Sequence, residues 1–243
     1  MTWTPVLRPG GRGRFVLLCD HASNHIPAEL GNLGLAKSEL GRHIAWDIGA
    51  AGVTRALSEL LDSPAILSGA SRLVIDCNRK LTSSELIPAV IHGMAVPGNA
   101  SICSASRRAR IDQWYRPYHD AVETVLINNL GRGVDSVVVA VHSMAPVLFG
   151  RERPWQIAIS SHMDRCLAEP VLAALRASGD FLVGDNEPYC IDPLIDYSIP
   201  FHALKRGLPN LQIEFRQDEI ATAAEQRRWA KITADILIAC ASA

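Results

Sequence analysis

Length, composition and charge favour one large domain and exclude several classes of protein. Nearly half of the 243 residues are apolar and the formal charge is −1, so the chain can bury a sizeable core and has no basic surplus for binding nucleic acid or an anionic membrane. No apolar run approaches the ~20 residues of a membrane span, and the N-terminal segment lacks the apolar core of a signal peptide. We expect a single domain over residues 1–243 in the cytoplasm.

The first half of the chain is predicted to alternate between strands, helices and loops. Residues 1–14 are an irregular lead-in rich in Pro, Gly and Arg. Strands are expected over residues 15–19, 65–67 and 72–76. Ser38 is a plausible N-cap for a helix that extends to about Leu61, because apolar residues recur there with helical period. Residues 80–104 read as a long loop, which is often a functional element.

The second half continues the same alternation. One helix is expected over residues 105–130 with a kink at Pro117. Strands are predicted over residues 137–141, 156–160, 181–183 and 211–215, and helices over 164–177 and 221–240. Several strands are apolar on both faces, as in a parallel sheet covered on both sides. The predicted fold class is therefore α/β, with three layers, a mainly parallel (mixed) sheet and helices on both faces.

Polar side chains stand at the ends of four of the predicted strands. They are Asp20 and His21, the segment 76–79, His142 and Ser143, and Glu214, which lies within the last strand. In an open α/β sheet the carboxyl ends of the strands converge on one crevice, so these groups are expected to lie together. Imidazole is a common metal ligand, and we predict that His21 and His142 share one ion.

A set of segments carries a family resemblance. The segments CDHASNHIP, HIAWDIGAAG, SRLVIDCNR, VVVAVHSM, VGDNEPY and LPNLQIEFRQD, in this order, resemble the N-formylglutamate amidohydrolase family over about residues 15–220. That family is similar in fold to zinc carboxypeptidases and aspartoacylase-like deacylases (zinc-exopeptidase-like, phosphorylase/hydrolase-like). The resemblance implies one Zn²⁺ per chain and cleavage of N-formyl-L-glutamate to formate and glutamate, a reaction of histidine degradation.

The resemblance also implies roles for individual residues. His21 and His142 match metal ligands, Asn78 and Arg79 a carboxylate-binding pair, Arg72 a group that polarises the carbonyl, and Glu214 the general base. The chain departs from the pattern at Asn24, where the family's relatives have a glutamate as third ligand. Asp47 is the proposed substitute, with His25 as the fallback, and Asn24 itself stays open as a third candidate.

General chemistry supports the same set of residues. Zinc with three protein ligands and an open position activates water near neutral pH, and a carboxylate such as Glu214 can move the proton. Planar guanidinium groups bind carboxylates in two-point contacts, which suits Arg72 and Arg79 to an acidic small-molecule substrate. Further substrate-contact candidates are Asp76, Asn186 and Tyr189, although the last two fall in a segment rich in turn-forming residues.

Other functions compete with this prediction. Because of the missing glutamate at position 24, the chain could be a member of the same fold that binds a small acidic ligand without turnover. A third possibility is a hydrolase of the same class that acts on a different amide or ester. A serine hydrolase is disfavoured because no Gly-x-Ser-x-Gly segment occurs.

The six cysteines form no Cys-x-x-Cys pair and are predicted to be free thiols. The oligomeric state is left open.

Overall fold

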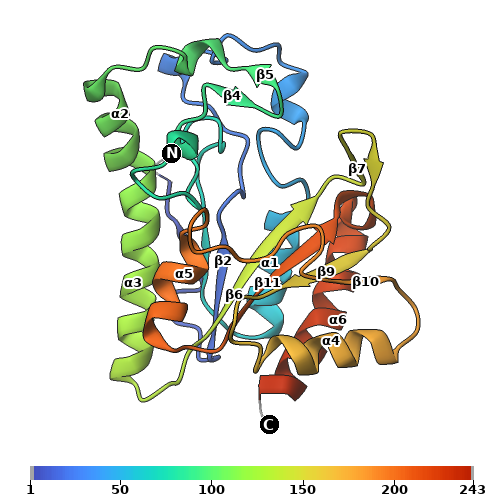
Figure 1. The fold of residues 1–243 in the computed structure, drawn as a ribbon. Coiled ribbons are helices and arrows are strands. Elements are labelled where there is room, and N and C mark those ends of the chain that lie inside the picture. The colour runs from blue at the N-terminus through green and yellow to red at the C-terminus, as the bar shows by residue number, and fades with distance from the viewer. Residues whose placement is uncertain (1–2, 242–243) are drawn as a thin grey trace.

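A seven-stranded mixed sheet is the centre of the computed structural model, which describes residues 3–241 (Figure 1). Its spatial order is β1-β3-β2-β6-β11-β9-β10. The strands are β1 (Val6–Leu7), β2 (Phe15–Cys19), β3 (Ala65–Leu67), β6 (Val137–Met144), β9 (Ile157–Ser160), β10 (Val183–Asp185) and β11 (Asn210–Arg216). Two small hairpins lie outside it, β4 (Val90–Ile91) with β5 (Met94–Ala95) and β7 (Val147–Leu148) with β8 (Arg151–Glu152).

The central strands run parallel. β3, β2, β6 and β11 are parallel neighbours, and β9 and β10 are parallel to each other. β11 and β9 pair antiparallel, as do β1 and β3 at the edge. The predicted α/β class with a mainly parallel, mixed sheet is confirmed. Its consequence for function is that β2, β6 and β11 end at the same edge of the sheet.

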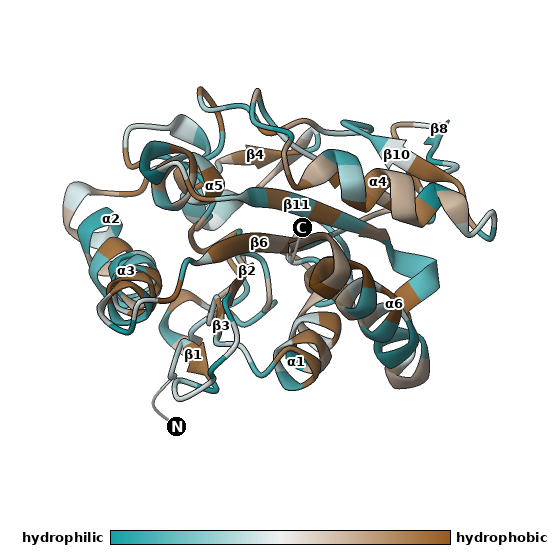
Figure 2. Ribbon diagram, turned by 90° about the horizontal axis from the view of Figure 1, so that it is seen from below, coloured by the Kyte–Doolittle hydropathy of each residue, from teal (hydrophilic) through white to brown (hydrophobic). Residues whose placement is uncertain are grey.

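Helices cover both faces of the sheet (Figure 2). The helices are α1 (Ala50–Leu60), α2 (Ser104–Arg110), α3 (Arg116–Gly131), α4 (Ala168–Ala177), α5 (Ser198–His202) and α6 (Ala223–Ala241). Alternate residues of each strand face opposite sides, so Leu17 and Val139 pack with α1, α4 and α6, whereas Leu18 and Val138 pack with α3 and α5. None of the helices within residues 3–241 is both long and apolar enough to cross a bilayer.

The strand predicted over residues 72–76 does not form. The chain turns there instead, because the backbone N–H groups of Val74 and Ile75 bond to the carbonyl of Ser71. The apolar residues that favoured a strand, Leu73, Val74 and Ile75, are all buried in a separate apolar cluster that is formed mainly by the long segments between β2 and α2. Within those segments the predicted loop 80–104 also contains the β4–β5 hairpin.

The helix predicted from Ser38 to Leu61 is also wrong in its first half. Only a 3₁₀ turn, Glu39–Gly41, forms before α1, which begins at Ala50. Gly49 has a φ of 83°, which a continuous right-handed helix cannot contain. A side chain at this position would also meet the backbone oxygen of Ile220 at 2.5 Å, so glycine is required by the close approach of two segments.

The long helix predicted over residues 105–130 forms without interruption, with a widened turn near the expected kink. α2 passes into a π-helical turn, Ile111–Tyr115, and α3 then begins at Arg116. Pro117 has no N–H for the helical ladder and its ring crowds the preceding turn, which favours such a widened turn. The lead-in predicted over 1–14 contains β1, and its residues 1–2 lie outside the described residues.

Candidate metal and substrate site

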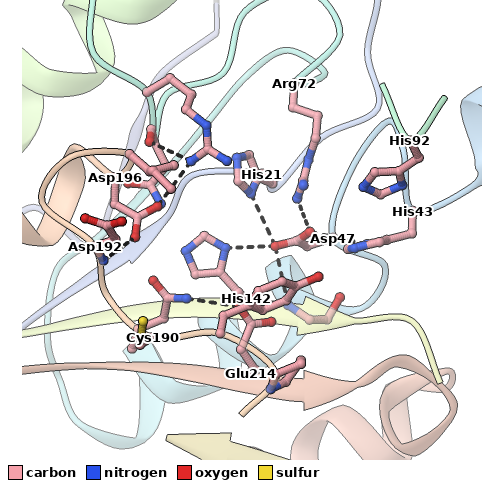
Figure 3. A pocket seen from close by; sticks show the side chains of 17 residues that line it. His21, His43, Asp47, Arg72, His92, His142, Cys190, Asp192, Asp196 and Glu214 are labelled. Carbon is pink, nitrogen blue, oxygen red and sulfur yellow. Dashed lines mark hydrogen bonds and ion pairs between the residues drawn. The ribbon is translucent and has the colours of Figure 1, made fainter. Parts of the chain in front are cut away.

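A pocket of about 410 Å³ opens where β2, β6 and β11 end (Figure 3). It contains basic, acidic and imidazole side chains in close proximity. It is lined by His21, His43, Asp47, Arg72, Asn78, Arg79, His92, His142, Ser143, Pro188, Tyr189, Cys190, Asp192, Ile195, Asp196, Gln212 and Glu214. Most of the predicted site residues therefore lie on one concave surface, as the convergence of parallel strand ends requires.

Three buried side chains meet at the floor of this pocket. One ligand atom from each of His21, Asp47 and His142 lies within 4.8 Å of the others. Oδ2 of Asp47 is 2.9 Å from Nδ1 of His142 and 3.4 Å from Nδ1 of His21. The same nitrogen of each ring, Nδ1, is turned toward the carboxylate. The two Nδ1 atoms and Oδ2 therefore form one group of atoms that could bind a metal ion.

Local structure explains how residues so distant in sequence converge. His21 is the second residue after β2, and His142 lies in the last part of β6, which pairs with β2. Asp47 belongs to the turn before α1, whose path is fixed when its backbone N–H bonds to the carbonyl of His21 at 2.9 Å. The hydroxyl of Ser143 donates to the carbonyl of Ile48 at 2.9 Å and ties the same turn to β6.

The outer nitrogen of each imidazole is next to a second carboxylate. Nε2 of His21 is 2.8 Å from Oδ1 of Asp76, and Nε2 of His142 is 3.3 Å from Oδ2 of Asp20. The hydrogen bond to Asp76 holds the proton on the outer nitrogen of His21 and leaves its inner nitrogen free to bind a metal, and the negative charge of Asp20 favours the same arrangement at His142. Two imidazole nitrogens and one carboxylate oxygen are a typical donor set for zinc, so the residues present fit this ion.

The buried charges shift the pKa values in this cluster. Burial opposes ionisation of His142, yet the carboxylates of Asp20 and Asp47 outweigh it and raise its pKa well above the usual value. For Asp47 burial is outweighed by Arg72 and the two imidazoles, so its pKa is well below the ordinary range. Burial is the leading cause at Glu214 and raises its pKa to about 7.

Arg72 and Glu214 lie on either side of the metal-capable cluster. Nη2 of Arg72 donates to Oδ1 of Asp47, the oxygen that does not face Nδ1 of His21 or His142. Glu214 pairs with His142 across the β6–β11 ladder and is 4% exposed, and its Oε1 accepts a hydrogen bond from Nε2 of Gln212 at 3.0 Å. A guanidinium and a buried carboxylate are thus placed beside the same cluster.

The predicted substrate-contact residues divide into two groups. Asn78, Arg79 and Tyr189 line the pocket. Asp76 and Asn186 do not belong to the lining: Asp76 accepts from His21 behind the ring, and Oδ1 of Asn186 accepts from the backbone N–H of Ser161 at 2.8 Å.

The two other candidates for a third ligand lie elsewhere. The side-chain amide of Asn24 is exposed and donates to the carbonyl of Leu40 at 3.0 Å. His25 is also exposed, and its ring packs edge-on against Trp114 with 5.9 Å between centroids. Neither residue belongs to the group of possible metal ligands around Asp47.

Sequence reasoning missed several residues at this site. His43 and His92 line the pocket on one side, and Asp192 and Asp196 line it on the opposite side (Figure 3). His43 stands four residues before Asp47, and its Nδ1 is 3.5 Å from Oδ1 of that carboxylate, so the spacing was a usable signal. No local pattern distinguishes Asp196, because the side chains that it accepts from, those of Asn78 and Arg79, lie more than a hundred positions away.

The fold and the site define a class of protein, an α/β protein with a metal-capable pocket at the carboxyl ends of parallel strands. The model of the family N-formylglutamate amidohydrolase matches residues 13–221. The chain therefore belongs to the N-formylglutamate amidohydrolase family, and the predicted membership is confirmed.

Two solved structures share the fold of this chain. Gene product Atu2144 from Agrobacterium tumefaciens is 36% identical, with a TM-score of 0.93 over 98% of this chain and 94% of that one. An N-formylglutamate amidohydrolase from Ralstonia eutropha JMP134 is 19% identical and shares the fold, with a TM-score of 0.76 over 99% of both chains. Among curated proteins, none matches this chain by sequence.

Proposed function

We propose that this chain is a zinc-dependent amidohydrolase that removes a small acyl group, such as formyl, from the nitrogen of an amino acid. The observation that carries the proposal is the convergence of Nδ1 of His21, Nδ1 of His142 and Oδ2 of Asp47 on the floor of the pocket that Glu214 also lines. N-Formyl-L-glutamate, the substrate in the family's name, is the reference compound.

The proposed ligands are His21, Asp47 and His142, and Asp76 and Asp20 lie next to the outer nitrogens of the two imidazoles. A zinc ion bound there supplies a Lewis acid next to the amide carbonyl and the attacking water. With three protein ligands the ion would keep a position for the reactants.

The remaining chemistry belongs to protein groups. Oε1 of Glu214 is occupied by Gln212, which fixes the orientation of the carboxylate and leaves Oε2 to accept the proton of the attacking water and return it to the leaving amine. Arg72, held by Asp47, presents positive charge toward the developing oxyanion. Burial of both groups strengthens these electrostatic effects.

The test is hydrolysis of N-formylglutamate and of its mono- and diamides by purified protein, with formate and free amine as the readouts. We expect turnover that a chelator abolishes and zinc restores. Absence of turnover on the whole series by zinc-loaded, folded protein would contradict the proposal and favour a ligand-binding protein that has lost catalysis.

A further inference from the structure

The chain places one of its own carboxylates on the pair of side chains expected to bind a substrate carboxylate. Oδ1 of Asp196 accepts from Nη1 of Arg79 at 3.1 Å and from Nδ2 of Asn78 at 3.2 Å. Its other oxygen, Oδ2, accepts from the backbone N–H of Asp192 at 3.0 Å. Both oxygens are thus hydrogen-bonded, and Asp196 lies in the wall of the pocket (Figure 3).

The side chain of Asn78 is fully engaged in hydrogen bonds to this wall of the pocket. Its Oδ1 accepts from the backbone N–H groups of Tyr197 at 3.0 Å and Ser198 at 2.9 Å, at the start of α5. The hydroxyl of Ser198 is in turn anchored on Oδ1 of Asp20 at 2.6 Å. Asn78 is 5% exposed, so turning its amide toward a ligand would break three hydrogen bonds in a buried place.

The charge balance at this wall disfavours another anion. The guanidinium of Arg79 contacts two carboxylates, since its Nε also donates to Glu85 at 3.0 Å. The carboxylate of Asp192 lines the same side of the pocket. Within the pocket lining the positive charge of Arg79 therefore stands beside the carboxylates of Asp192 and Asp196, with Glu85 in solvent outside it, and a substrate carboxylate placed at this wall would experience net repulsion.

We propose that Asp196 determines specificity by selecting N-acyl substrates whose group at this wall is an uncharged amide or an amine, in place of a carboxylate. This inference rests on the proposed function and refines its substrate class. Asp196 occupies the site of the expected substrate carboxylate, neutralises Arg79 and keeps Asn78 engaged, so the amino-acid part of the substrate carries fewer negative charges than N-formylglutamate.

The experiment compares kcat/KM for N-formylglutamate with that for its two monoamides, N-formylglutamine and N-formylisoglutamine. Whichever carboxylate faces the wall, one monoamide replaces it with a group of nearly the same shape. We expect the wild-type protein to favour one monoamide by about tenfold, as repulsion at a partly buried site implies. A wild-type preference for N-formylglutamate over both monoamides would overturn the proposal without any variant.

The Asp196→Asn variant tests whether this residue causes the preference. The amide keeps the shape of the side chain and removes its charge. The preference for the monoamide over N-formylglutamate, measured as the ratio of their kcat/KM values, should therefore fall about tenfold, because the KM for N-formylglutamate becomes lower. The matched control is Asp185→Asn, whose carboxylate pairs with Arg165 outside the pocket lining and should leave the preference unchanged. An unchanged preference in Asp196→Asn, or an equal loss of kcat on all three compounds, would overturn the proposal.

Binding calorimetry with the amino-acid products separates this inference from the proposed function. Glutamine or isoglutamine should bind the wild-type protein more tightly than glutamate even if no compound is hydrolysed. Tighter binding of glutamate would contradict the role of Asp196, whereas absence of hydrolysis with the expected binding order would contradict only the proposed reaction.

Discussion

Nδ1 of His142 lies 2.9 Å from Oδ2 of Asp47, although 95 positions separate the two residues in the chain. The contact joins the end of a central strand to a turn that precedes a helix. His21 reaches the same oxygen from the neighbouring strand. The candidate metal site is therefore a product of the sheet topology, and its parts can be tested one at a time.

Glu214 is expected to be needed for turnover and dispensable for metal binding. Glu214→Gln keeps the shape of the side chain but cannot accept a proton, so kcat should fall by roughly 10²–10⁴-fold with zinc content unchanged. Steady-state kinetics and elemental analysis check this. Glu152→Gln, on the exposed strand β8, is the control. Near-wild-type turnover of Glu214→Gln would show that another group moves the proton.

Asp76 is expected to position His21 and not to contact substrate. In Asp76→Asn the outer nitrogen of His21 loses its anionic partner, so zinc affinity should weaken by about 10–100-fold. Competition with a coloured chelator measures the affinity directly. Asp218→Asn, which disturbs only a surface pair with Arg216, should bind zinc normally. Unaltered affinity together with a raised KM would favour the substrate-contact role predicted from sequence.

Gly49 is expected to control the position of Asp47. Gly49→Ala forces a side chain into a backbone with positive φ and against Ile220, which should lower the free energy of unfolding by about 1–3 kcal/mol and weaken metal binding. Gly41→Ala is the matched control, since nothing lies within 4 Å of the added carbon. Denaturant unfolding compares the two variants. Equal stability would mean that the turn adapts without cost.

A buried histidine pair should make stability depend on pH. Nδ1 of His119 is 2.9 Å from Nε2 of His202, and burial lowers the pKa of His119 to about 3 and that of His202 to about 4, with Glu123 and Arg206 as the charged neighbours. The unfolded chain takes up protons on these two rings near pH 6.5 and the folded chain does not, so the contribution of this pair to stability falls as the pH drops below about 6.5, whereas the raised pKa values of His142 and Glu214 act in the opposite direction.

The size of this effect can be measured with one variant. Between pH 7.5 and pH 5 each ring should cost about 2 kcal/mol of unfolding free energy, and His119→Gln should remove about that much of the loss. Urea titrations at the two pH values test it, with the exposed His25→Gln as the control. If His119→Gln loses stability with pH as steeply as the wild-type protein, the neutral buried pair is not the cause.

Some of the fold and site was predictable from local sequence alone. Continuous apolar runs identified β2, β6 and β11, because a strand buried on both faces has no polar positions. Histidines directly at the ends of such runs, His21 and His142, then had to lie at one edge of the sheet. Glu214 was recognisable as a site residue because burying an unpaired carboxylate inside an apolar strand costs free energy, so such a residue is more often part of a site.

Other features depend on contacts that no local pattern records. The turn that carries Asp47 replaces a helix because Gly49 meets Ile220, which is distant in sequence. The segment 72–76 alternates like a strand but packs into a loop core whose members are contributed by many segments. Asp196 contacts Arg79 because the chain between β10 and α5 lies beside the pocket in the folded structure.

Zinc stoichiometry tests the central claim most directly. Elemental analysis after dialysis should find about one zinc per chain in the wild-type protein and almost none in His21→Ala or His142→Ala, with circular dichroism confirming that both variants are folded. His25→Ala, four positions from His21 but exposed and outside the cluster, should retain its zinc. Folded wild-type protein that binds no zinc, or full occupancy in His21→Ala and His142→Ala, would contradict the account.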